Sequence, residues 1–300
     1  SVNVSDWDDC GRLVDKVYDH FGHCEVLINN AGLSPLFPDL ISVTEALYDK
    51  ALAAAARAIA IDSTVAESYS AIAWVRAIRG ESREADRQYR RSIALDSTLA
   101  TAWGWHGLLA AWKGEFEIAR QRVARAHDLE PVSLVVRGWE AQLDLMQRRF
   151  AHADSVSARI AAMDSSFALN WHTRADAQLG LGHAKEAVAI LERRVALLPP
   201  APASETHGML AYAYAHAGDT TRARAVINQM RSVTGGRVPA LGIVACTLEL
   251  LREHEAAVAL VSHAITERDP WVNLFARGER YDQLRKDPRA LAMLSKIDTW

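Results

Sequence analysis

The sequence predicts a mainly α-helical protein, a right-handed α-solenoid of helix-turn-helix repeats with a small N-terminal α/β fragment and a C-terminal helical cap. Three series of residues that recur every 34 residues carry this prediction. An apolar residue followed by an acid stands at Ile61-Asp62, Leu95-Asp96, Leu129-Glu130 and Met163-Asp164. The other two series are Ala85, Ala119, Ala153 and Ala187, and Gly80, Gly114 and Gly182, with Arg148 at the missing glycine position.

Residues 66–98 illustrate one repeat. Apolar residues at helical spacing over 67–80 predict a first helix, and Gly80 ends it because glycine adopts the left-handed conformation at low cost. Residues 82–96 predict a second helix, in which Ala85 lies on the inner stripe and lets the two helices approach closely. One repeat cannot bury its apolar stripe alone, so we expect stability to be shared between neighbouring repeats.

Two later copies contain most of a known repeat motif. The second copy carries Trp103, Gly107, Gly114, Ala119, Val123, Ala126 and Pro131, and the fourth carries Trp171, Ala175, Gly182, Ala187, Leu191 and Pro199. This pattern resembles the tetratricopeptide repeat over residues 48–268, with further copies around Ala223 and Ala257 and a lone second helix over 49–62. The resemblance implies a noncatalytic scaffold that binds a protein or peptide on a concave face.

The candidate peptide-binding residues are mostly tryptophans, of which the chain has nine. They are Trp74, Trp105, Leu108, Trp112 and Trp139. In tetratricopeptide repeat proteins these places line the concave groove, and aromatic residues dominate binding hot spots. Packing between adjacent first helices is the alternative, and the sequence leaves both open.

Chaperone-binding members of that family clamp an acidic C-terminal peptide with lysine and asparagine side chains. The matching places here hold Glu67, Ser70, Trp74, Thr101 and Gly104. An apolar or mixed peptide is therefore the better expectation than an acidic tail.

Residues 1–47 predict a different element. Residues 5–22 predict an amphipathic helix and residues 24–32 a short buried strand. Phe21-Gly22, the VLINNAG stretch at 26–32 and Ser34-Pro35 resemble the middle of the short-chain dehydrogenase/reductase family. The resemblance implies an alternative function, an NAD(P)-dependent oxidoreductase, with Asn29, Asn30, Ala31 and Gly32 as a vestigial cofactor motif.

The sequence departs from that family where the chemistry is done. It has no T-G-x-x-x-G-x-G phosphate loop, and Asn3 stands where the family has an aspartate. No tyrosine has a lysine four residues on, and Tyr281 has Arg285 instead, so proton transfer to a carbonyl has no donor. We therefore expect a protein that is not an enzyme, with no catalytic residues and no cofactor.

Residues 269–300 break the period and predict a capping segment. The residues D-P-W at 269–271 and R-Y-D-Q-L-R-K-D-P-R at 280–289 resemble a closing segment that follows such arrays in bacterial signalling and regulatory proteins. The resemblance implies the sensor or docking part of such a regulator. We expect Trp271 and Leu274 to cover the last repeat, and Asp287-Pro288 to begin a final helix.

Composition and charge exclude other classes of partner. The net charge of −3 and the lack of long basic runs argue against nucleic acid and anionic membranes, and no apolar stretch is long enough to span a bilayer. Three scattered cysteines favour a reducing compartment, so we expect a cytoplasmic protein. Cys10, His20, His23 and Cys24 lack the paired spacing of a zinc site, so no metal is expected.

Overall fold

The computed structural model describes residues 45–164, 167–197, 204–233, 240–267 and 278–297, together with Lys16, Asp19, Asp269 and Val272. The chain divides into two units, Ser1–Phe37 and Pro38–Trp300. In the first unit the structure describes Lys16 and Asp19 alone, and both residues are helical and exposed. The predicted strand at 24–32 and the motif Asn29, Asn30, Ala31 and Gly32 lie outside the described residues.

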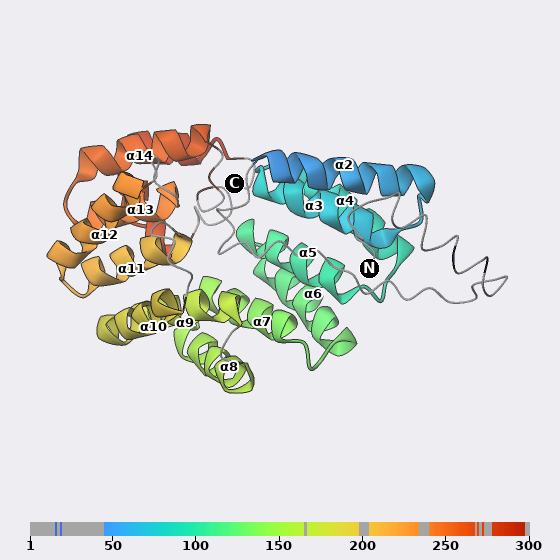
Figure 1. Cartoon of the computed structure of the whole chain (residues 1–300), viewed down its shortest axis with the longest axis horizontal. Helices are drawn as coiled ribbons and strands as arrows, with labels where there is room; N and C mark the ends of the chain where they lie inside the picture. The colour runs from blue at the N-terminus through green and yellow to red at the C-terminus, as the bar shows by residue number, and fades with distance from the viewer. Residues whose placement is uncertain are drawn as a thin grey trace. The chain divides into compact units, whose positions relative to one another are not determined.

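The second unit is a series of helix pairs joined by short turns (Figure 1). Helix α2 (Glu45–Ile61) comes first and packs on α3. The pairs are α3 (Ala66–Ile78) with α4 (Ser82–Leu95), α5 (Ala100–Trp112) with α6 (Phe116–Leu129), α7 (Leu134–Met146) with α8 (Phe150–Met163), α9 (Ala168–Gly180) with α10 (Ala184–Ala196), α11 (Glu205–His216) with α12 (Thr220–Val233), and α13 (Leu241–Leu250) with α14 (His254–Thr266). The predicted α-solenoid of helix-turn-helix repeats is confirmed.

The pairs stack in the order of the chain. Each first helix contacts the next first helix, from α3 through α5, α7, α9 and α11 to α13. Helices α4, α6, α8 and α10 contact both their own first helix and the following one. No helix in the described part of the chain combines the length and apolar composition needed to cross a bilayer.

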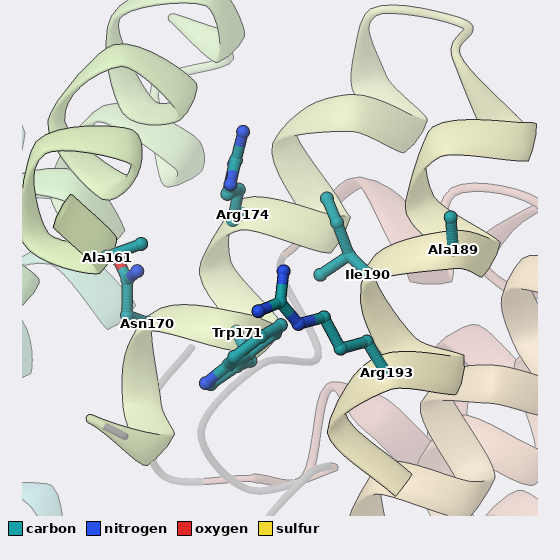
Figure 2. A pocket seen from close by; sticks show the side chains of 7 residues that line it. All are labelled: Ala161, Asn170, Trp171, Arg174, Ala189, Ile190 and Arg193. Atoms are coloured by element: carbon teal, nitrogen blue, oxygen red, sulfur yellow. The ribbon is translucent and has the colours of Figure 1, made fainter. Parts of the chain in front are cut away.

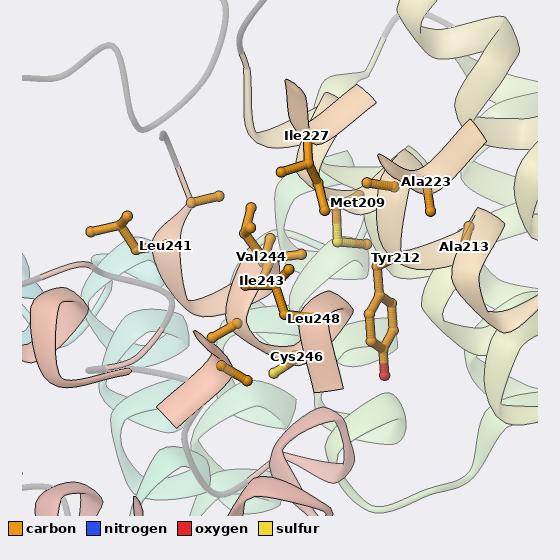
Figure 3. Close-up of a cluster of buried hydrophobic side chains, with 14 of the residues drawn as sticks. Met209, Tyr212, Ala213, Ala223, Ile227, Leu241, Ile243, Val244, Cys246 and Leu248 are labelled. Carbon is orange, nitrogen blue, oxygen red and sulfur yellow. The ribbon is translucent and has the colours of Figure 1, made fainter. Parts of the chain in front are cut away.

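Six alanines mark the seams between the helices of each pair. Ala85, Ala119, Ala153, Ala187, Ala223 and Ala257 all have exposed fractions of 0%. Large side chains fill the space around them, and in the C-terminal half this cluster includes Met209, Tyr212, Ile243 and Cys246 (Figure 3). These positions hold alanine because a larger side chain would force the two helices of a pair apart.

The turn inside each pair repeats one backbone conformation. The residue five places before the seam alanine has a positive φ in all six pairs. These residues are Gly80 (76°), Gly114 (81°), Arg148 (58°), Gly182 (82°), Gly218 (79°) and Arg252 (62°). Arg148 and Arg252 show that stacking imposes the turn even where no glycine favours it.

The C-terminal segment combines short 3-10 turns with a final helix. It consists of η2 (Glu279–Tyr281), η3 (Leu284–Lys286) and α16 (Pro288–Leu294), and α16 packs on α14. Asp287 caps α16 by accepting a hydrogen bond from the Arg289 amide at 2.6 Å, and Pro288 is its first residue. The prediction that Asp287-Pro288 begins a final helix is confirmed, whereas Trp271 and Leu274 lie outside the described residues.

Candidate functional site

The four candidate tryptophans come together in one aromatic cluster across α3, α5 and α7. The ring centroids of Trp74 and Trp105 are 3.9 Å apart, and those of Trp74 and Trp112 are 6.2 Å apart. Trp139 meets Trp105 edge-on at 5.2 Å. Four tryptophans from separate places in the sequence therefore form one continuous cluster of rings.

Three of the five candidate residues are core residues by burial. The exposed fractions of Leu108, Trp112 and Trp139 are 0%, 3% and 0%. Gly104 makes room for Trp139, because a Cβ at Gly104 would lie 2.0 Å from two atoms of the Trp139 ring. For these three residues the structure favours packing between first helices over direct contact with a ligand.

Trp74 and Trp105 are different, since both are only partly buried and pack with one side against the core. Glu67 and Thr101, on the first turns of α3 and α5, are exposed, whereas Ser70 and Gly104 are buried. These four places thus carry neutral groups and one acid. This surface can offer apolar contact and the indole N–H groups.

Six residues form a row along the first helices, each eleven residues before a seam alanine. This central row consists of Trp74, Leu108, Gln142, Asp176, Tyr212 and Cys246. Its first half is apolar or amide in character, and its second half holds an acid, an aromatic ring and a thiol. The 34-residue period of the sequence places these residues in one row, but the sequence indicates only Trp74 and Leu108 of them as candidate binding residues.

A pocket of about 370 Å³ lies between α8, α9 and α10 (Figure 2). The guanidinium of Arg193 lies 5.8 Å from the centre of the Trp171 ring, and Arg174 Nε donates to Asp154 Oδ1 at 3.3 Å. Trp171 is one of the repeat-motif residues of the fourth copy, and the motif does not indicate this pocket. Both guanidinium groups already have partners, so the free walls are mainly the aliphatic side chains of Ala161, Ala189 and Ile190.

Metal ligands do not gather in the described ranges, where no three His, Cys, Asp or Glu side chains are placed to hold an ion. Cys10, His20, His23 and Cys24 lie outside those ranges.

Comparisons with known proteins give structural but no sequence relatives. No family model and no curated protein matches the chain. A tetratricopeptide repeat protein from Parabacteroides merdae is 13% identical with a TM-score of 0.55, and the match covers 87% of this chain and 91% of that one. The fold is tetratricopeptide repeat-like.

Two further solved structures have a similar fold. A chain of the APC/C hetero-tetramer Cut9–Hcn1 is 14% identical with a TM-score of 0.58, covering 97% of this chain and 52% of that one. The present chain thus spans about half of that protein. PilW, a type IV pilus biogenesis factor, is 15% identical with a TM-score of 0.52, covering 77% of this chain and 98% of that one. At these identities the likeness shows the tetratricopeptide repeat-like fold alone.

Proposed function

We propose that this protein is a noncatalytic scaffold that binds a protein or peptide on the face formed by its first helices. Trp74 and Trp105 are the proposed contact residues. The observation that carries the proposal is a half-buried tryptophan pair, 3.9 Å apart, on two adjacent first helices of a tetratricopeptide repeat-like array. We also propose, from the resemblance of residues 269–300 to a closing segment, that the array is the docking part of a bacterial regulatory protein.

The packing of the two rings suits them to binding. Trp112 and Trp139 hold Trp74 and Trp105 from behind, so little side-chain freedom remains to be lost when a ligand arrives. Large, rigid aromatic side chains of this kind supply most of the binding energy in many interfaces. A chain of similar fold is itself part of the APC/C hetero-tetramer Cut9–Hcn1.

The surroundings favour an apolar or mixed peptide as the partner. The places that correspond to the peptide-clamping positions hold Glu67, Ser70, Trp74, Thr101 and Gly104, so no lysine or arginine stands there to clamp an acidic peptide. A ligand that places an aromatic or aliphatic side chain against the two indole rings would use both their area and their N–H groups.

The test is peptide selection followed by measurement of affinity. Peptides from a random phage-displayed library are selected on the full chain, and the best one is titrated by fluorescence anisotropy. Trp74→Ala/Trp105→Ala should weaken binding about 30-fold or more, the loss expected for hot-spot residues worth about 2 kcal/mol or more.

The matched control is Ile118→Ala/Val132→Ala. These side chains are 42% and 78% exposed and lie in α6 and the turn after it, so their removal should change affinity less than twofold. Circular dichroism must show that the tryptophan variant keeps its helices. Unchanged affinity in a folded variant, or equal losses in both double variants, would exclude the tryptophan pair as the contact site.

A further inference from the structure

The second half of the central row has the chemistry of a guanidinium site. Asp176 on α9 offers a carboxylate, Tyr212 on α11 offers the face of a ring, and Cys246 on α13 is small. A carboxylate pairs with a guanidinium through charge-assisted hydrogen bonds, and an aromatic face attracts the same cation. Trp74, Leu108 and Gln142 in the first half offer no such set.

Arg280 of η2 fills this place. Its Nη2 donates to Asp176 Oδ1, and the exposed fractions of the two side chains are 11% and 20%. Its guanidinium carbon lies 4.8 Å from the centre of the Tyr212 ring. Tyr212 is held in turn by His216, edge-on at 4.6 Å, so the ring under the guanidinium is fixed in place.

The residues after Arg280 extend the contact over several repeats. The Tyr281 hydroxyl lies so close to Gly242 of α13 that a Cβ there would be 2.2 Å from it. Arg148, in the turn between α7 and α8, donates from Nη2 to Asp282 Oδ2 at 2.7 Å. Residues 278–286 therefore lie along the first helices of the last three pairs and reach the turn of the pair before them.

We infer that the first-helix surface formed by Asp176, Tyr212 and Cys246 is a binding site for an arginine side chain, which Arg280 occupies within the chain and an arginine-bearing peptide of a partner occupies when residues 278–286 leave. The site is separate from Trp74 and Trp105. Partner binding here requires displacement of residues 278–286, whereas the tryptophan pair remains accessible.

Displacement of the segment uncovers Tyr281 and Leu284, whose exposed fractions are 1% and 0%, so a partner peptide must cover the same apolar surface. Two features keep the rest of the array in place. Between α14 and α16 the segment is built from two 3-10 turns, not from a helix of the stack. The final helix is held independently on α14, where Arg289 pairs with Glu255 at 2.9 Å and Asp287 lies 2.8 Å from His254 Nε2. An attached segment competes at an effective concentration on the order of millimolar, so a free peptide should bind the wild-type chain poorly.

The test uses a fluorescein-labelled peptide with the sequence of residues 278–287, GERYDQLRKD, and the full chain. The variant Arg280→Ala empties the site, so it should bind the peptide at least about tenfold more tightly than the wild-type chain. A peptide with alanine at the position of Arg280 should bind at least about tenfold more weakly to that variant. Adding Asp176→Asn to the variant should abolish binding, because the carboxylate charge is lost.

Several results would overturn the inference. These are equal affinity of folded Arg280→Ala for both peptides, no binding of either, or wild-type binding as tight as that of the variant. If Arg280→Ala fails to fold, Arg280→Lys takes its place, since lysine keeps the charge beside Asp176 but lacks the planar fork. Arg280→Lys should still bind the peptide more tightly than wild type, and equal binding would again overturn the inference.

A further variant separates this site from the proposed scaffold surface. In the Arg280→Ala background, Trp74→Ala/Trp105→Ala should leave the affinity for the arginine peptide unchanged, because the two groups lie on different repeats. A loss of affinity would place the peptide on α3 and α5 and would overturn the assignment.

Discussion

His106 joins two helix pairs through a neutral imidazole. It lies on α5 with 2% of its surface exposed, and its Nε2 lies 2.8 Å from Asp86 Oδ1 of α4. Its ring stacks on Tyr89 with centroids 5.4 Å apart. Burial lowers the pKa of His106 to about 4, although the hydrogen bond with Asp86 opposes this change, and the nearby charge of Arg122 lowers the pKa further.

His106 should therefore make the free energy of unfolding depend on pH. Below its ordinary pKa of 6.5, the unfolded chain binds a proton that the folded chain, with a pKa of about 4, does not. Stability is thus lost as pH falls from about 6.5 to about 4, on the order of 2–3 kcal/mol for this group. Urea unfolding at pH 7 and at pH 4.5 measures the decrease in the free energy of unfolding between these pH values. This decrease should be smaller in His106→Gln than in wild type by about 2–3 kcal/mol. Equal losses in both proteins would show that His106 is not neutral when folded.

The burial of individual tryptophans depends on the residues opposite them. Trp139 is fully buried because Gly104, on the preceding first helix, leaves space for its ring. The repeat motif placed Trp74, Trp105, Trp112 and Trp139 on first helices, and the structure brings them together. The repeat motif could not predict which of the four tryptophans are exposed, because exposure depends on the sizes of neighbouring side chains in other repeats.

At the scale of the elements, the stacking of the helix pairs determines the backbone conformation of the turn inside each pair. All six turn residues have positive φ, whether they are glycine or arginine. An L-residue in this conformation costs roughly 1–2 kcal/mol, partly offset by the greater freedom of glycine in the unfolded chain. The chain is therefore less stable with Arg148 and Arg252 at these turns than it would be with glycine there.

Arg252→Gly should stabilise the protein by about 0.5–1 kcal/mol, because glycine relieves the left-handed conformation at φ 62°. Arg252 is exposed, so its removal should cost little contact. The measurement is the midpoint of urea unfolding at unchanged m-value. The reverse change in an equivalent turn, Gly218→Ala, should destabilise by a similar amount. A stability loss in Arg252→Gly would mean that its side chain contributes more than the strain costs.

The period in the sequence predicted the helices of the array, because each repeat must present the same small seam residue to the same neighbour. The α2 helix and the final helix after Asp287 also followed from local signals, a helical run of alanines and an Asp-Pro start. The path of residues 278–286 could not be predicted. Arg280 meets Asp176, which is 104 residues earlier, and no local pattern encodes a contact at that separation.

At the scale of the whole molecule, we expect the stability of each of the two units to depend mainly on contacts within that unit. The chain divides into two units, Ser1–Phe37 and Pro38–Trp300. In a stacked array, stability comes from neighbouring repeats. We retain the proposal of three parts, residues 1–47, 48–268 and 269–300, with the refinement that α2 begins at Glu45.

A fragment of residues 38–300 should fold without the first unit. It keeps α2 whole and all the contacts among α2 to α16, so its thermal midpoint should match that of the full chain within about 2 °C, equivalent to less than about 1 kcal/mol for a chain of this size. Circular dichroism at 222 nm, scaled for length, measures both helicity and the midpoint. The matched control removes α2 as well, as a fragment of residues 65–300, and should melt lower because the apolar face of α3 loses its cover. A fragment of residues 38–300 that melts as low as this control would show that the first unit stabilises the array.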